Sequence, residues 1–160
     1  MSIGQRDSIP ASPRDGASAA RRIARGVRRM LASAGHSTVE EMSLPDGRRA
    51  DIVALQPDGF IAIVEIKSCR ADFRSDRKWR NYLEFCDQFY FAIDAQTPMG
   101  LIPADVGLIL ADDFGAQLVR PAPEARLAAA RRKSMLLRFA RLSADRLHAL
   151  QDPRWRDPTA

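Results

Sequence analysis

The alternation of apolar and polar residues along the chain predicts an alternation of helices and strands. Residues 18–34 place Ile23, Val27 and Leu31 on one helical face and arginines on the other, so they predict an amphipathic helix, capped by Ser18 and stopped by Gly35. Runs of strand-forming residues follow at 38–44, 48–55, 60–67, 88–93, 105–110 and 116–119. Helical patterns are found at 75–86, 124–142 and, after Ser143 as a cap, 144–150.

Residues 47–67 predict a β-hairpin whose register is set by its turn. The turn is the sequence from Gln56 to Gly59, in which a Pro, an Asp and a Gly follow one another, as in a type I turn closed by a Gly bulge. A three-residue loop pairs Gln56 with Phe60, and counting back places Asp51 opposite Glu65. Both faces of this hairpin are largely apolar, which predicts a central sheet covered by helices on both faces, an α/β arrangement.

The predicted register gathers chemically active side chains at one end of the hairpin. Lys67 lies two residues beyond Glu65 and so joins the face of Asp51 and Glu65. Two opposed carboxylates repel each other, and a bound divalent cation would remove that cost. Adjacent Glu40 and Glu41 are expected to point to opposite faces, and the pattern does not decide which one reaches this end. The alternative is a surface ion triad without a metal.

Length and composition fit one globular domain. The chain has 160 residues, of which 46% are hydrophobic and 28% charged. We expect a disordered leader over 1–16, a single domain over 17–152 and a loose tail over 153–160. No apolar run is long enough for a membrane span and no export signal is seen, so Cys69 and Cys86 are expected to be reduced thiols. The isolated His36 and His148 are expected to be structural.

Charge is distributed unevenly along the chain. The net charge of +5 divides into +5 for residues 1–35, −6 for 36–119 and +6 for 120–160. An acidic middle between basic ends fits a metal-binding centre flanked by surfaces for a polyanion, although the arginine-rich helices could equally be solvated faces. The basic positions expected to contact such a polyanion are Lys78, Arg49, Arg131 and Arg138.

The order of elements and the motif residues resemble known families. An Asp-bearing strand followed by Glu65-Ile66-Lys67, a helix and a strand resembles the PD-(D/E)xK (restriction-endonuclease-like) nuclease core. The longer pattern, including GRRADIVAL, IAIVEIKS, DFRSDRKW and RRKSMLLRFARL, resembles the MmcB family of bacterial DNA repair proteins over most of residues 20–152. Ala50 directly precedes Asp51, at the position where the PD-(D/E)xK motif has proline.

The resemblance implies a metal site and a reaction. It implies Mg²⁺ or Mn²⁺ held by Asp51, Glu65 and the backbone carbonyl of Ile66, with Lys67 activating water or stabilising the phosphate in the transition state. Glu41, or Glu40 in its place, would complete the site. The expected function is that of a metal-dependent DNA endonuclease-like repair protein, hydrolysing phosphodiester bonds in damaged or structured DNA.

The expected partners are DNA and either a second copy of the chain or another repair protein, with no membrane. The expected location is the bacterial cytoplasm, in association with the nucleoid. Two alternatives remain: a catalytically inactive DNA- or partner-binding module on the same fold, and a structural or regulatory protein whose basic faces are merely solvated.

Overall fold

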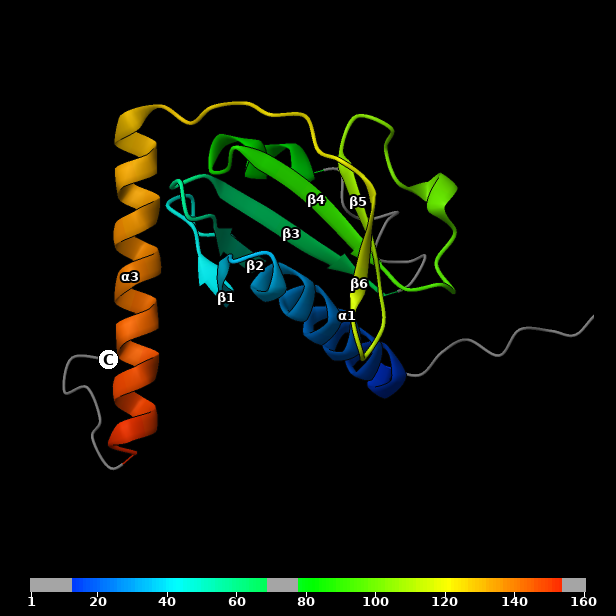
Figure 1. Ribbon diagram of the computed structural model, residues 1–160, viewed down its shortest axis with the longest axis horizontal. Coiled ribbons are helices and arrows are strands. Elements are labelled where there is room, and N and C mark those ends of the chain that lie inside the picture. The colour runs from blue at the N-terminus through cyan, green and yellow to red at the C-terminus, as the bar shows by residue number, and fades with distance from the viewer. Residues whose placement is uncertain (1–12, 69–77, 154–160) are drawn as a thin grey trace, which may run out of the picture.

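The computed structural model describes residues 13–68 and 78–153. The fold is built on one six-stranded mixed sheet (Figure 1). The strands lie in chain order across the sheet. They are β1 (Ser37–Ser43), β2 (Arg49–Leu55), β3 (Ile61–Lys67), β4 (Gln88–Ile93), β5 (Gly107–Ala111) and β6 (Ala116–Arg120). All six predicted strands are present, with ends within two residues of the prediction.

The sheet changes direction at its centre. β1, β2 and β3 form an antiparallel meander, β3, β4 and β5 run parallel, and β6 returns antiparallel to β5. Parallel neighbours need a crossover connection, so the long segments after β3 and β4 carry the chain back across the sheet. With helices on both sides of the sheet, the predicted α/β arrangement is confirmed.

Helix α1 (Pro13–Ser33) covers one face of the sheet. Its buried stripe of Ile23, Val27 and Leu31 packs against small and branched residues of the central strands. The helix ends as predicted, because Gly35 has φ of 81° and the amides of Gly35 and His36 donate to the carbonyls of Ala32 and Leu31.

The start of α1 corrects two predictions. The helix begins at Pro13, where proline suits a first turn, so residues 13–16 are helical and the expected leader over 1–16 was too long. Ser18 is not a cap: it lies inside the helix, and its hydroxyl accepts a hydrogen bond from Arg22 at 3.1 Å. Residues 1–12 lie outside the described residues.

A close contact at Gly26 holds α1 against the turn between β5 and β6. A side-chain carbon built at Gly26 would overlap the backbone carbonyl oxygens of Asp112 and Gly115, in the β5–β6 turn. Arg29 also donates to the carbonyls of Asp113 and Phe114, at 3.1 and 3.3 Å. Only glycine allows this approach of a helix to a turn.

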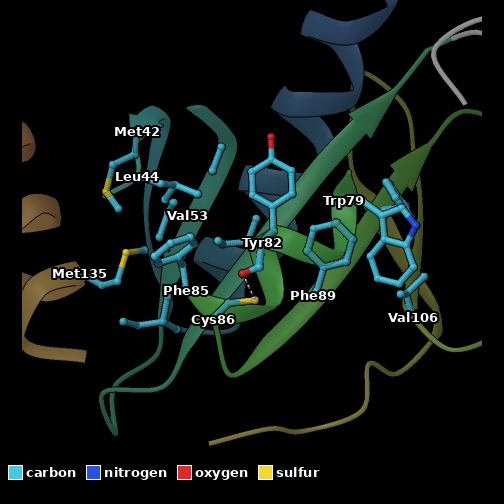
Figure 2. Close-up of a cluster of buried hydrophobic side chains, with 14 of the residues drawn as sticks. Met42, Leu44, Val53, Trp79, Tyr82, Phe85, Cys86, Phe89, Val106 and Met135 are labelled. Carbon is cyan, nitrogen blue, oxygen red and sulfur yellow. Dashed lines mark hydrogen bonds between the residues drawn. The ribbon is translucent and has the colours of Figure 1, made fainter. Parts of the chain in front are cut away.

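The opposite face is covered by aromatic residues and by part of the C-terminal helix. Trp79 and Tyr82 stack on Phe89, with ring centroids 5.5 and 5.8 Å apart, and Phe91 meets Phe89 edge-on at 5.0 Å. Figure 2 shows Met135 reaching toward this cluster from the C-terminal helix, beside Phe85.

The helix predicted over 75–86 is wrong in length and type. Its described part is a six-residue 3-10 helix, η1 (Trp79–Glu84), and residues 75–77, with the predicted cap Ser75, lie outside the described residues. Trp79, Tyr82 and Cys86 are buried as expected, whereas Leu83 is 42% exposed. The second short helix, η2 (Met99–Leu101), lies in the predicted loop before β5.

The C-terminal helix begins five residues later than predicted and continues unbroken through the two predicted helices. Helix α3 (Ala129–Gln151) continues through Ser143, whose hydroxyl donates to the carbonyl of Phe139 at 2.8 Å instead of capping a new helix. Its apolar face packs against the core, with Met135 buried and Leu136, Phe139 and Leu142 partly buried. Beyond Pro153 the predicted tail lies outside the described residues.

A buried charged cluster ties α3 to the sheet. The Asp87 carboxylate accepts hydrogen bonds from the Arg132 guanidinium at 2.6 and 2.8 Å and from the amides of Ile61 and Leu127, both at 2.8 Å. Burial alone would raise the pKa of Asp87, but these partners outweigh it and hold that pKa below its ordinary range. None of the described helices is long and apolar enough to cross a membrane.

Candidate functional site

The predicted hairpin turn and its register are confirmed. Gly59 has φ of 88°, the amide of Gly59 donates to the carbonyl of Gln56 at 3.0 Å, and the amide of Gln56 donates to that of Phe60 at 2.9 Å. Leu55 pairs with Ile61 and Val53 with Ile63, as counted from the turn. The turn residues therefore determine which side chains meet at the far end of the hairpin.

Strands β2 and β3 separate where the acidic residues begin. Their regular pairing ends at Ile52 and Val64. Beyond it, the amide of Asp51 donates to Glu65 Oε1 at 3.1 Å, and the amide of Ile66 donates to Asp51 Oδ2 at 2.8 Å. Each carboxylate thus accepts a hydrogen bond from a backbone amide of the opposite strand. The structure therefore brings Asp51, Glu65 and Ile66 together.

Lys67 lies deeper than the carboxylate of Asp51. Lys67 and Glu65 are buried, at 8% and 6% exposure, and Lys67 Nζ lies 5.8 Å from the centre of the Phe91 ring. The positive charge of Lys67 acts on Asp51. The three motif residues are therefore linked by hydrogen bonds and by charge. They do not share one solvent-exposed face of the hairpin.

Burial dominates the electrostatics of Asp51. Burial raises the pKa of Asp51 above its ordinary value, and the nearby charge of Glu41 raises it further. The amide of Ile66 and the charges of Lys67 and Arg49 oppose this without cancelling it. A bound cation would stabilise the ionised form of such a half-buried carboxylate, so this is a favourable place for a cation to bind.

Asp51 opens into a hollow of about 400 Å³ between α1 and the edge of the sheet. Its lining consists mainly of acidic residues and residues with small side chains, with one arginine from α1. The lining residues are Ala20, Arg21, Ala24, Glu40, Glu41, Asp51, Ile66 and Ser68.

Glu40 and Glu41 both line this hollow, so the expectation that they point to opposite faces was wrong. The physical reason is the backbone of Glu41, whose φ of 51° is left-handed and breaks the alternation of β1. Glu40 pairs with Arg28 at 3.2 Å and Glu41 with Arg49 at 3.4 Å, both in exposed ion pairs.

The donors fit a hard divalent cation of the magnesium type. Among the described residues no three His, Cys, Asp or Glu side chains come close enough to form a metal cage. Mg²⁺ does not require such a cage, because it is commonly held by one or two carboxylates, waters and substrate oxygens. Asp51, Glu65 and the Ile66 carbonyl offer that number and kind of ligand, with Glu41 at the same hollow.

The predicted DNA-contacting residues are scattered. Arg49 pairs with Glu41, and Arg138 lines a neighbouring hollow that also includes Glu41. Arg131 instead pairs with Glu84 at 3.5 Å, and exposed Lys78 does not line the Asp51 hollow. Arg21, on the predicted arginine face of α1 but not among the named DNA contacts, lines the Asp51 hollow.

This architecture defines a class, an α/β protein with paired carboxylates at a split between two central strands. Within that class, the family model for "DNA repair protein MmcB-like" matches residues 8–154, and the chain belongs to this family. No curated protein matches the chain. A solved structure, the SPO1766 protein of unknown function from Silicibacter pomeroyi, is 45% identical, covers 89% of this chain and 97% of its own, and superposes with a TM-score of 0.85.

Proposed function

We propose that this protein is a metal-dependent deoxyribonuclease of the PD-(D/E)xK type that acts in DNA repair. The observation that carries the proposal is a pair of hydrogen bonds across the split between β2 and β3, from the Asp51 amide to the Glu65 carboxylate and from the Ile66 amide to the Asp51 carboxylate. Lys67 lies two residues beyond Glu65. Membership of a DNA repair family supports the setting.

In the proposed mechanism, Asp51, Glu65 and the carbonyl of Ile66 would hold Mg²⁺ or Mn²⁺, and Glu41 lines the same hollow as Asp51. When bound, such an ion would supply charge neutralisation on the phosphate and a lowered pKa for bound water. Lys67 orients the attacking water or stabilises charge on the phosphate, and its burial beside Phe91 keeps it in position.

The test is a cleavage panel of plasmid, gapped, flap and branched DNA with Mg²⁺ or Mn²⁺. Asp51→Asn and Lys67→Ala are expected to lower cleavage at least about 100-fold, since the first removes a proposed metal ligand and the second a charge that acts on the phosphate. Matched controls are Asp105→Asn, in an exposed pair with Arg80, and exposed Lys133→Ala, which should cut like the wild type.

Two results would contradict the proposal. If Asp51→Asn and Lys67→Ala cut as well as the wild type, these residues are not the site. If the wild type binds DNA but cuts none of the panel with either metal, the chain is a DNA-binding module that keeps the fold without turnover.

A further inference from the structure

Three hollows lie next to one another along the edge strand β1. The Asp51 hollow shares Arg21 and Glu40 with a hollow of about 490 Å³ beside α1. It shares Glu41 with a hollow of about 440 Å³ between β1 and α3. The shared residues make the three hollows neighbours, and we call this set of hollows the β1 trough.

The β1 trough is positive at both ends and negative at its centre. Arg21, Arg25 and Arg28 line its α1 end, at helical spacings of four and three residues and with exposed side chains. Arg138 and Arg141 line its α3 end, three residues apart and exposed, and they outnumber the one carboxylate of α3 at this end, Asp145.

The carboxylates at the centre do not neutralise these ends strongly. The Arg28–Glu40 pair is exposed on both sides, and exposed pairs of this kind contribute little free energy. Phosphate groups can therefore compete for the arginine. Acidic residues at the centre and cations at the ends fit a polyanion held on both sides of a metal.

The composition of the trough lining bears on whether a duplex or a single strand of DNA would fit it better. Proteins that hold single strands stack successive bases on aromatic side chains. Among the residues that the structure describes, no Phe, Tyr or Trp lines any of the three hollows. Arginines on two separate helices instead suit phosphates, which carry no sequence information.

We propose that the β1 trough binds the sugar-phosphate backbone of duplex DNA. The α1 arginines hold one side and the α3 arginines the other, so that a phosphate is placed over the Asp51 hollow. The inference rests on the proposed function for its choice of DNA as substrate. Binding by these arginines does not require the metal.

The test is fluorescence anisotropy with a labelled duplex and a single strand of equal length, in EDTA, from about 50 to about 200 mM KCl. The variants are R25E/R28E for the α1 end and R138E/R141E for the α3 end. The control, R126E/K133E, removes the same net charge, but these residues line a hollow that shares Leu137 and no charged residue with the trough. Thermal unfolding checks the fold, and R25A/R28A replaces R25E/R28E if charge reversal disturbs α1.

The wild type is expected to prefer the duplex. Each trough variant is expected to weaken duplex binding at least about tenfold and to flatten the salt dependence by about two phosphate contacts, since each contact contributes about 0.9 to the slope. The control is expected to stay within about threefold.

Equal losses in the control and the trough variants, unchanged binding in the trough variants, or tighter binding of the single strand would each overturn the inference. So would a wild type that binds neither DNA. Because EDTA removes the metal, these outcomes are independent of the cleavage panel: a protein that cuts DNA yet binds without its trough arginines loses this inference and keeps the proposed function.

Discussion

Replacing Asp87 with asparagine would weaken the attachment of α3 to the sheet. The Asp87 side chain is fully buried, and its two oxygens accept four hydrogen bonds, two of them from Arg132. An asparagine keeps one acceptor oxygen and turns an NH₂ group toward donors, so about half of these bonds are lost and Arg132 loses its counter-charge. The backbone bonds of Asp87 to Ile61 and Ala125 are unaffected.

The cost follows from the burial of the pair. Removing one partner of a buried ion pair costs about 3–5 kcal/mol. The Arg132 side chain is 24% exposed, so water recovers part of its hydration, and we expect the lower end, about 3 kcal/mol. This is a large share of the roughly 5–15 kcal/mol that stabilises an ordinary domain.

Urea unfolding followed by circular dichroism would measure the free energy of unfolding for the wild type, Asp87→Asn, Arg132→Gln and the double variant. The double-mutant cycle is expected to give a coupling above about 1 kcal/mol. Asp105→Asn, which removes an exposed pair with Arg80, serves as the matched control and should cost less than about 0.5 kcal/mol.

The pH dependence gives a second test of the same residue. Because the folded pKa of Asp87 is lowered, its contribution is present above the unfolded pKa of about 3.9 and is lost as pH falls through the folded pKa. Asp87→Asn should lack this acid-dependent loss. A variant as stable as the wild type at neutral pH, with the same acid dependence, would refute the reasoning.

Three further predictions concern the candidate site and α1. Because burial raises the folded pKa of Asp51, its stability cost appears as pH rises through the unfolded pKa toward the folded one, so Asp51→Asn should raise the Tm at pH 7 and leave it unchanged in strong acid. Excess Mg²⁺ should raise the Tm of the wild type but not of Asp51→Asn, and equal metal responses in differential scanning calorimetry would contradict the ligand assignment. Gly26→Ala gains about 1 kcal/mol of helix propensity but forces a methyl against the carbonyls of Asp112 and Gly115, for a net loss of about 1–2 kcal/mol in urea unfolding. Gly100→Ala, with open space around it, should be close to neutral, and a stabilised Gly26→Ala would show that the contact with the β5–β6 turn is soft.

Local chemistry explains which parts of the fold could be predicted. Proline, Asp and Gly in the Gln56–Gly59 turn leave few backbone conformations, so the register of β2 and β3 followed from four residues. The split beyond Ile52 was not predicted. It depends on carboxylate side chains accepting hydrogen bonds from backbone amides of the opposite strand, in place of backbone carbonyls.

The helices show where local signals are insufficient. Trp79 and Tyr82 are three residues apart, a spacing that fits a 3-10 helix as well as an α-helix. Ser143 has the chemistry of a cap but satisfies its hydroxyl within α3. The Asp87–Arg132 pair joins residues far apart in the sequence, and no periodicity in the chain indicates it.

The left-handed residue Glu41 also affects how this protein meets other copies of itself. β1 is an edge strand, and unpaired edges invite strand-to-strand aggregation. Pairing between β1 and β2 is regular on both sides of Glu41 but is interrupted at Glu41 itself, and two adjacent carboxylates stand at that point. A further strand would have to follow an irregular backbone and approach two negative charges. The residue that brings both glutamates to the hollow therefore also protects the open edge of the sheet from unwanted β-association.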